Sequence, residues 1–500
     1  MWIFHASRRF ATTLTPRKIN ELLSANEVFL GAQDALPTFV KSIECNQLAS
    51  NSPIEDRIRV SSVQLPHSKE PTLILGVFDG HGGGTTADLI SRRLFNYIAL
   101  SLHPTPGNLK ISKHGRVDDI IVDLHNSPQP TESSRLQAVE LSLLDVYRNE
   151  LSKTQSKNLA STDNEPDHQS DVVAHLKSSF QRCDDDLSQE IQQNLLKPTS
   201  LDQQSLRHYL SATVSGCCAL VMVIHQGSVY LASSGDCRAV LGLFDGQRSS
   251  PTPDSTKDST GPHIEHPKTN SYKALELNDE HNCDNINEIR RLTASHPRSE
   301  QNTMIRHNRL LGHLMPFRAF GDFNYKWPAE TIRACGITRA FGPGVIPSSY
   351  ETPPYLIVEP DVNVVRVDAL EDTSMKSERQ VSHITTLNEL HHGGNGAGKY
   401  LVMASDGLWE QFESSRDVVE AIVDHSLNAH VEGNEEDYDP NCATYILRSA
   451  LRFGPHQDIG MDVEKMRRIH HIRLESTLTL PKSVVRNFRD DISIIVLKLD

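Results

Sequence analysis

The feature that most constrains this chain is a short apolar run that ends in an acidic residue, a histidine and glycines. Leu73 to Phe78 are apolar or glycine, and Asp79-Gly80-His81-Gly82-Gly83-Gly84 follows directly. The run has the length and composition of a buried strand, which the glycines end. A carboxylate at such a place is unfavourable unless something pairs with it. A hard divalent cation, bound by carboxylate and carbonyl oxygens, is one possible partner, and an ordinary Asp-Gly turn is the alternative.

Length and charge limit the classes of function. The chain has 500 residues, enough for one to three domains. Its formal charge of −14 disfavours nucleic-acid binding. A hydrophobic content of 37% is below the globular average, which predicts insertions. The longest apolar run, Cys217 to Ile224, is about half of the roughly 18 residues that a membrane span requires, so we expect no transmembrane segment.

The cysteines argue against two further classes of protein. Eight are scattered along the chain without CxxC pairs, which disfavours a zinc ribbon and a disulfide framework. We expect reduced cysteines that mostly pack in the core. They are Cys45, Cys183, Cys217, Cys218, Cys237, Cys283, Cys335 and Cys442.

The N-terminal segment has a composition of its own. Residues 1–20 contain Arg8, Arg9, Arg17 and Lys18 but no acidic residue, which is typical of an organelle transit peptide. We predict a mitochondrial leader in residues 1–20 with cleavage after Phe10. An ordinary basic N-terminus is the alternative. Residues 21–50 are expected to form a helical extension.

The remaining sequence, 51–500, is expected to form one domain of mixed helices and strands. Ile54–Gln64 alternates like a strand, and Ala87–Leu102 and Val172–Ile191 carry apolar residues at helical spacing. Cys217–Ile224 and Ser228–Ala232 flank Gln226-Gly227, the pattern of a hairpin. Four polar stretches read as insertions into this domain. They lie near residues 103–168, 245–272, 370–397 and 430–442.

Acidic residues recur where short apolar strands begin or end. Gathered at one end of a sheet sandwich, they could hold two or three divalent cations, and oxygen ligands favour Mg²⁺ or Mn²⁺ over zinc. Two such ions can activate a water for attack on phosphorus, and His81 is near enough to protonate a leaving oxygen. Taken singly, each acid could be a turn residue or a cap. The acidic positions are Glu55 with Asp56, Asp79, Asp236, Asp406 and Asp490.

With these acidic positions, the chain resembles a known family, the PP2C (PPM) metal-dependent serine/threonine protein phosphatases. The matching blocks occur in the family's order over Asn51 to Asp500. They are Ile54-Glu55-Asp56, Val77-Phe78-Asp79-Gly80-His81-Gly82-Gly83, Ser234-Gly235-Asp236-Cys237-Arg238, Arg318-Ala319-Phe320-Gly321-Asp322, Ala404-Ser405-Asp406-Gly407-Leu408-Trp409-Glu410 and Arg489-Asp490-Asp491-Ile492-Ser493.

The resemblance implies an α+β fold, with an antiparallel β-sandwich flanked by helices and metals in a cleft at one end. It implies that Asp79 bridges two metal ions and that the Gly80 carbonyl binds the first. Asp406 and Asp490 would hold the second ion, and Glu55 would reach the cluster through water.

The resemblance also implies a weaker third metal site and an acid catalyst. Asp236 and Glu410 would form the third site together with Asp406. His81 would be the general acid.

Further segments are similar to the mitochondrial pyruvate dehydrogenase phosphatases within this family. This similarity implies phosphoserine on the E1 component of the pyruvate dehydrogenase complex as substrate, and a location in the mitochondrial matrix. The segments are Asn51 to Arg57, Leu310 to Asp322 with Tyr325-Lys326-Trp327, and Thr352 to Leu356.

Three positions depart from the general family pattern. Asn51 stands where many members have an arginine that clamps the substrate phosphate, and loss of that arginine should weaken phosphate binding. The pyruvate dehydrogenase phosphatases resemble this chain here, so we interpret Asn51 as a trait of that branch. Glu410 and Asp491 replace the commoner Asp and Asn.

Other functions remain open from the sequence. One is a catalytically inactive scaffold of the same fold, although a scaffold is free to lose its metal carboxylates and none is missing here. Another is a phosphatase with a different mitochondrial substrate. A third is a metal hydrolase of small phosphate esters, which would have a closed pocket rather than an open cleft.

Overall fold

The structure is a computed structural model. It describes residues 14–66, 68–111, 117, 120–127, 134–158, 168–198, 201–248, 270–366, 384–386, 398–428, 439–453 and 463–500.

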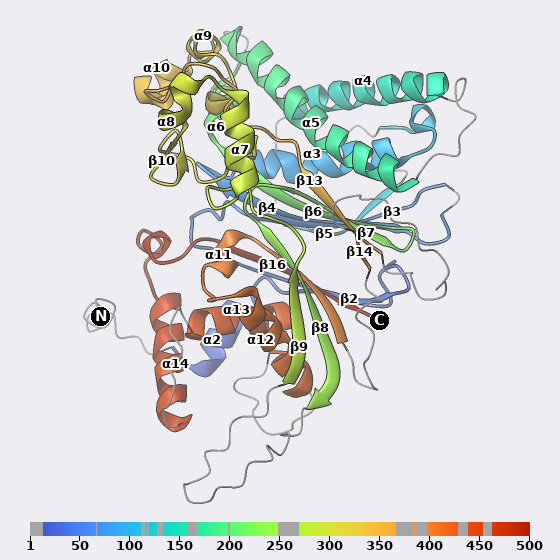
Figure 1. Cartoon of the computed structure of the whole chain (residues 1–500), viewed down its shortest axis with the longest axis vertical. Helices are drawn as coiled ribbons and strands as arrows, with labels where there is room; N and C mark the ends of the chain where they lie inside the picture. Colours follow the sequence, from blue (N-terminus) through green and yellow to red (C-terminus); the bar gives the residue numbers. More distant parts are fainter. Residues whose placement is uncertain are drawn as a thin grey trace, which may run out of the picture.

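Two β-sheets pack face to face, with helices on both outer faces (Figure 1). The first sheet has the order β1 (Val28–Leu30), β2 (Val40–Leu48), β16 (Ile492–Leu499), β15 (Gly398–Ala404), β8 (Arg238–Arg248) and β9 (Asn270–Glu276). The second has the order β14 (Ile384–Thr386), β13 (Asp361–Arg366), β7 (Ser228–Ser234), β6 (Gly216–His225), β4 (Thr72–His81), β3 (Arg57–Val63) and β5 (Ile121–Asn126), with β12 (Phe320–Gly321) beside β6. Pairing is antiparallel except between β13 and β14, so the predicted α+β sandwich is confirmed.

The central strand β4 shows why the apolar run is unbroken. Leu73 and Leu75 face the core between the sheets, whereas Ile74 and Phe78 face the core under the helices. Successive side chains of a strand point to opposite faces, so a strand covered on both faces is apolar throughout. The strand continues to His81, which places the acidic residue and the histidine within the paired strand.

Helices cover the outer faces of both sheets (Figure 1). On the second sheet lie α3 (Thr85–Leu102), α4 (Ser134–Asn158), α5 (His168–Leu195) and α6 (Gln203–Val214). On the first lie α2 (Pro16–Leu23), α11 (Asp406–Trp409), α12 (Ser415–Asn428), α13 (Cys442–Phe453) and α14 (Val463–Leu478). The helices α3 and α5 and the hairpin of β6 and β7 confirm the elements predicted there.

A lateral segment, residues 281–357, projects from one end of the sandwich (Figure 1). It has its own small apolar core around Leu292, Phe317 and Tyr355. Its elements are α7 (Ile286–Ser295), α8 (Gln301–Met304), β10 (Ile305–Arg306), β11 (Arg309–Leu310), β12, α9 (Ala329–Ala334) and α10 (Ile337–Phe341).

The expected helical extension over 21–50 is wrong. Only α2 is helical there, and β1 and β2 follow it. The strand β2 pairs with β16 near the other end of the sequence, and this long-range pairing decides its conformation.

The N-terminal boundary also needs revision. Ile19, inside the segment 1–20 assigned to a leader, is buried beside Leu23 in the core under α13 and α14. A leader that ends at Phe10 is compatible with this packing, whereas one that ends at residue 20 would remove part of a packed helix. Residues 1–13 lie outside the described part of the chain.

The four predicted insertions differ in their outcome. The stretch 103–168 is partly integrated, because β5 pairs with β3 and Leu144 of α4 is buried. In the other three, the structure describes the end of β8 and the start of β9 in 245–272, β14 within 370–397, and residues 439–442 at the start of α13. The remaining residues of these stretches, 249–269, 370–383 with 387–397, and 430–438, lie outside the described part of the chain.

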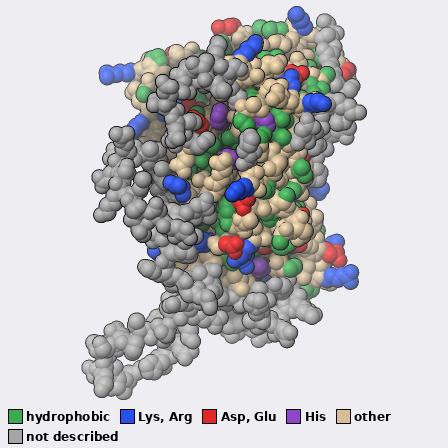
Figure 2. All heavy atoms as spheres, turned by 90° about the vertical axis from the view of Figure 1, so that its right-hand side faces the viewer, with side chains coloured by type: hydrophobic (Ala, Val, Ile, Leu, Met, Phe, Trp, Pro, Cys, Tyr) green, Lys and Arg blue, Asp and Glu red, His purple; other side chains and the backbone are tan. Residues whose placement is uncertain are grey.

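Three general features complete the fold. The eight cysteines are free, and seven are buried, as expected for packing cysteines. Across the described residues, no helix combines the length and the apolar character needed to cross a membrane. On the face in Figure 2, the basic and acidic side chains of the described residues are interspersed rather than gathered by sign.

Candidate metal centre

Strand register brings the predicted acidic residues to one end of the sandwich. In the second sheet, Asp79 of β4 lies opposite Cys218 of β6, and Ala219 lies opposite Ser234, two residues before Asp236. The neighbouring pair of Arg57 with Phe78 sets the start of β3 beside the same end of β4.

The first sheet delivers its acids to the same end. Ala404 at the end of β15 lies opposite Ile494 of β16, so Asp406 and Asp490 flank one strand pair. The acids from both sheets therefore meet at the open end between them.

Three carboxylates form the centre of the cluster. Asp79, Asp236 and Asp406 each present an oxygen within 4.8 Å of the others. Asp79 and Asp236 are buried. Burial, followed by the charges of neighbouring carboxylates, raises the pKa of Asp79 and of Asp406 well above the usual range. Such a cluster is favourable only with added positive charge, and its oxygen ligands suit a hard divalent cation.

Two further acids line the outer side of the cluster. Burial raises the pKa of Asp490, against the opposing charge of Arg486, whose Nη2 lies 2.5 Å from Asp490 Oδ2. Glu410 is largely exposed as a residue, but partial desolvation and the charge of Asp490 raise the pKa of its carboxyl. Both carboxyl groups therefore interact electrostatically with the acidic cluster.

Glu55 and Gly80 lie against each other on the adjacent side. The Gly83 N–H donates to Glu55 Oε2 at 3.1 Å, while burial raises the pKa of Glu55. A Cβ at Gly80 would lie 2.4 Å from the Glu55 carbonyl oxygen, so only glycine fits there. Gly80 is therefore required by packing as well as by any ligand.

Asp56, to which the family resemblance assigns no role, also belongs to the cluster. It is buried, and its Oδ2 has no hydrogen-bond partner within the described chain. Burial and the charge of Asp491 raise the pKa of Asp56 to about 7. An unpartnered buried carboxylate oxygen beside Asp79 is what a bound cation, or its water, would satisfy. The residues present therefore fit a metal centre.

Two of the departures from the family pattern contact each other. Asp491 Oδ2 accepts from the Asn51 side chain at 3.1 Å and from the Glu55 backbone N–H at 2.8 Å. Asp491 Oδ1 accepts from the Asn51 backbone N–H at 2.8 Å. The Asp491 carboxylate thus holds the loop that leads to Glu55, and both the backbone and the side chain of Asn51 take part in this contact.

His81 has a partner that sequence reasoning missed. Its Nε2 lies 2.6 Å from Oδ2 of Asp322, which is almost fully buried. Burial alone would lower the pKa of His81, but Asp322 outweighs it and the net pKa is raised. Asp322 ends the block Arg318-Ala319-Phe320-Gly321-Asp322, for which the sequence analysis predicts no chemical role. That block was the available signal.

The space for this pair depends on Gly216, which lies opposite His81 across β4 and β6. A Cβ at Gly216 would lie 2.2 Å from His81 Nε2 and 2.1 Å from Asp322 Oδ2. Both contacts are too short to exist, so a side chain here would separate the pair.

If His81 is the general acid that the family resemblance implies, Gly216→Ala should lower kcat by about 10- to 100-fold. Mn²⁺ binding, measured by calorimetry, should stay within about 3-fold of the wild type, a free-energy difference below 1 kcal/mol. The matched control is Gly242→Ala in β8, where the atoms nearest to a Cβ belong to the Val419 side chain. Equal activity of Gly216→Ala and the wild type would contradict this role of the glycine.

Comparison with known proteins agrees with the geometry. The family described as protein phosphatase 2C matches residues 108–454. The mitochondrial [pyruvate dehydrogenase [acetyl-transferring]]-phosphatase 1 of Pongo abelii is 30% identical, over 100% of this chain and 86% of that protein. Phosphatase 2 of the same kind from Homo sapiens is 31% identical, over 98% of this chain and 84% of that protein.

Two more distant similarities were found. The mitochondrial phosphatase 1 of Saccharomyces cerevisiae is 23% identical over 90% of this chain and 67% of that protein. A crystal structure of a serine-threonine phosphatase 2C from Toxoplasma gondii is 13% identical, with a TM-score of 0.41, over 95% of this chain and 99% of that chain.

Proposed function

The chain belongs to the protein phosphatase 2C family of metal-dependent serine/threonine phosphatases, and we propose that it dephosphorylates the pyruvate dehydrogenase complex. The proposed substrate is phosphoserine on the E1 component, in the mitochondrial matrix. The observation that carries this proposal is similarity over nearly the whole chain to relatives named as mitochondrial pyruvate dehydrogenase phosphatases.

The proposed metal ligands follow from the cluster. Asp79 would hold two cations, Mg²⁺ or Mn²⁺, with the Gly80 carbonyl on one of them and Asp406 and Asp490 on the other. Glu55 would act through water. When bound, such ions supply positive charge for the phosphoryl oxygens and a water of lowered pKa. The support for this assignment is the short separation of the central carboxylates and their mutual repulsion.

The remaining acids would form a weaker third site. Burial raises the pKa of Asp406, and the charges of Asp236 and Glu410 both add to that increase. Asp56, buried with one unpartnered oxygen, is placed to hold a water or a cation within the same cluster.

His81 is proposed as the general acid. With Nε2 engaged by Asp322, the other ring nitrogen, Nδ1, would carry the proton to the leaving serine oxygen. The raised pKa of His81 keeps the ring protonated closer to neutral pH, as an acid catalyst requires. Asp322 would orient the ring and stabilise its charge.

We predict that His81→Gln slows hydrolysis of phosphoserine peptides by about 100-fold, because the serine alkoxide is a poor leaving group. Hydrolysis of an aryl phosphate, whose leaving group needs no proton, should slow by less than about 5-fold. The measurement is kcat for both substrates at saturating Mn²⁺. Equal slowing of both substrates would argue against a role in protonation.

The substrate itself is tested with phosphorylated E1. The wild-type protein should dephosphorylate it at least about 10-fold more efficiently, in kcat/KM, than an unrelated phosphoserine protein. Phosphoproteomics of mitochondria that lack this protein should show the same E1 site accumulating phosphate. Accumulation at other proteins with E1 unchanged would identify a phosphatase with a different mitochondrial substrate.

A further inference from the structure

The turn that carries Asp236 is held from outside the sheet, by residues that precede and begin the lateral segment. The Asn278 side chain accepts from the Ala239 N–H at 2.8 Å and donates to the Cys237 carbonyl at 3.0 Å. These two bonds fix the backbone just after Asp236. Asn278 itself is buried.

The fully buried His281 fixes the backbone just before Asp236. The Gly235 N–H donates to His281 Nδ1 at 3.1 Å, and the His281 N–H donates to the Gly235 carbonyl at 2.9 Å. Gly235 has a φ of +122°, a conformation open to glycine but strained for other residues, so glycine is required at this turn. Asn278 and His281 thus fix the backbone on both sides of Asp236, which is a candidate metal ligand.

The contact with Gly235 also defines the tautomer of the His281 ring. Because Nδ1 accepts a hydrogen bond, the hydrogen lies on Nε2, which donates to Asp361 Oδ2 at 3.1 Å. Asp361 Oδ1 in turn accepts from Arg318 Nη1 at 2.9 Å. The ring therefore links the Asp236 turn to an ion-pair network.

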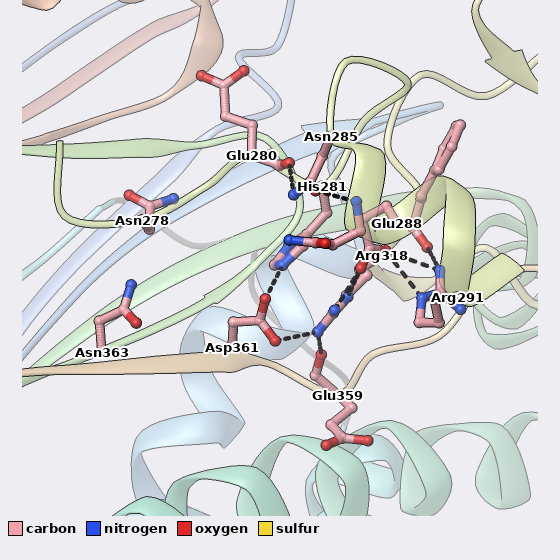
Figure 3. A network of polar contacts seen from close by, with 12 residues as sticks. Asn278, Glu280, His281, Asn285, Glu288, Arg291, Arg318, Glu359, Asp361 and Asn363 are labelled. Carbon is pink, nitrogen blue, oxygen red and sulfur yellow. Dashed lines mark hydrogen bonds and ion pairs between the residues drawn. The ribbon is translucent and has the colours of Figure 1, made fainter. Parts of the chain in front are cut away.

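That network reaches into the lateral segment (Figure 3). The nearly buried Arg318 lies 2.5 Å from Glu288 Oε1 of α7, and Arg291 of the same helix pairs with Glu288 Oε2 at 2.9 Å. Phe317 of the segment's apolar core donates its N–H to the His281 carbonyl at 2.6 Å. The position of the Asp236 turn is therefore tied to the packing of the segment.

We propose that Asn278 and His281 are positioning residues that hold Asp236 in the geometry needed to bind a divalent cation. This inference rests on the proposed metal role of Asp236. The essential contact is the hydrogen bond between Gly235 N–H and His281 Nδ1. The Asp361 contact secures the ring, and through it the lateral segment supports the metal centre.

Two substitutions separate the contacts of the ring. In His281→Asn the side-chain oxygen can take the place of Nδ1 and accept from Gly235. In His281→Gln the amide nitrogen can take the place of Nε2 and donate to Asp361. The His281→Ala variant removes both contacts. The polar variants also keep the test informative if His281→Ala fails to fold.

The measurement is Mn²⁺ binding to the metal-stripped full chain by titration calorimetry, with Asp236→Asn defining the binding that depends on Asp236. We expect His281→Ala and His281→Gln to weaken that binding at least 10-fold, and His281→Asn to stay within about 3-fold of the wild type, a difference below 1 kcal/mol. Mn²⁺ binding that does not depend on Asp236 should be unchanged in all three.

The control is His296→Asn. His296 is another buried histidine of the lateral segment, stacked on Tyr355 and bonded to Thr352, away from the Asp236 turn. It should lower the melting temperature without changing Mn²⁺ affinity. The proposal is overturned if His281→Ala binds Mn²⁺ like the wild type, or if His296→Asn weakens Asp236-dependent binding equally.

Failure of the proposed function would look different from failure of this inference. A wild-type protein without phosphatase activity would refute the function, whereas the binding measurement reports on the position of Asp236 alone. Wild-type Mn²⁺ binding that Asp236→Asn leaves intact would remove the premise of both the ligand assignment and the inference.

Discussion

Asp79→Asn should lower kcat/KM for phosphoserine substrates at least 1,000-fold, equivalent to about 4 kcal/mol of transition-state stabilisation. Burial, and after it the charges of Asp406, Asp56, Asp236 and Asp490, raise the pKa of Asp79, so this acid interacts with the whole cluster. Asparagine has the same shape but lacks the negative charge that would hold the cations. The measurement is steady-state kinetics over a Mn²⁺ titration, with circular dichroism to check the fold.

Stability distinguishes this loss from misfolding. Removing one charge from a crowded acidic cluster should leave the melting temperature of the metal-free protein unchanged or higher. The control is Asp186→Asn on α5, where a buried aspartate bonds to Tyr97 and Arg182 away from the cluster. That control should lose stability but keep activity. An Asp79→Asn enzyme within 10-fold of wild-type activity would be incompatible with the assignment.

Metal removal should destabilise the protein, and more so as the pH rises. Burial and neighbouring charges raise the pKa of Asp79 and Asp406, and that of Asp56 to about 7. In an unfolded chain an aspartate titrates near 4. Between these values the folded metal-free protein binds more protons than the unfolded chain, so its stability falls as the pH rises through this window.

The expected size can be judged from Asp56 alone. A shift of about three pKa units corresponds to a penalty of roughly 4 kcal/mol, fully present above pH 7 and absent below pH 4. Bound Mg²⁺ or Mn²⁺ would compensate the same charges, so the increase in melting temperature on adding metal should be larger at pH 8 than at pH 6.

Calorimetric melting curves in EDTA and in Mg²⁺ at the two pH values measure this effect. Asp56→Asn should flatten the pH dependence of the EDTA curve, because it removes one of the buried groups responsible. The charge argument would be contradicted if raising the pH from 6 to 8 in EDTA stabilised the wild-type protein relative to Asp56→Asn.

Sequence patterns predicted the helices and strands whose conformation follows from the regular burial of their own residues. The apolar run of β4 and the helical spacing of α3 and α5 reflect burial on regular faces, which the sequence displays directly. The strand β2 was missed because it carries polar residues at buried positions. Its Asn46 is fully buried and is satisfied by Thr444 Oγ1 at 2.6 Å, a partner almost 400 residues away.

The residues of the candidate site also fall into those that the local sequence predicts and those that it does not. The acids at strand ends were recognisable because a buried or half-buried carboxylate beside glycine needs a reason. Asp322 and His281 were not, because their roles come from contacts with His81 and Gly235 across the fold rather than from any pattern around them. The unsatisfied oxygen of Asp56 is likewise visible only once the strands are paired.

The position of β16 has a consequence for biosynthesis. This strand follows every other described element in the sequence, yet it lies inside its sheet, between β2 and β15. On the ribosome, β2 of the nascent chain therefore cannot pair with β16 until more than 440 further residues have been made. Until then Asp490 is missing from the acidic cluster, and the proposed metal centre is incomplete.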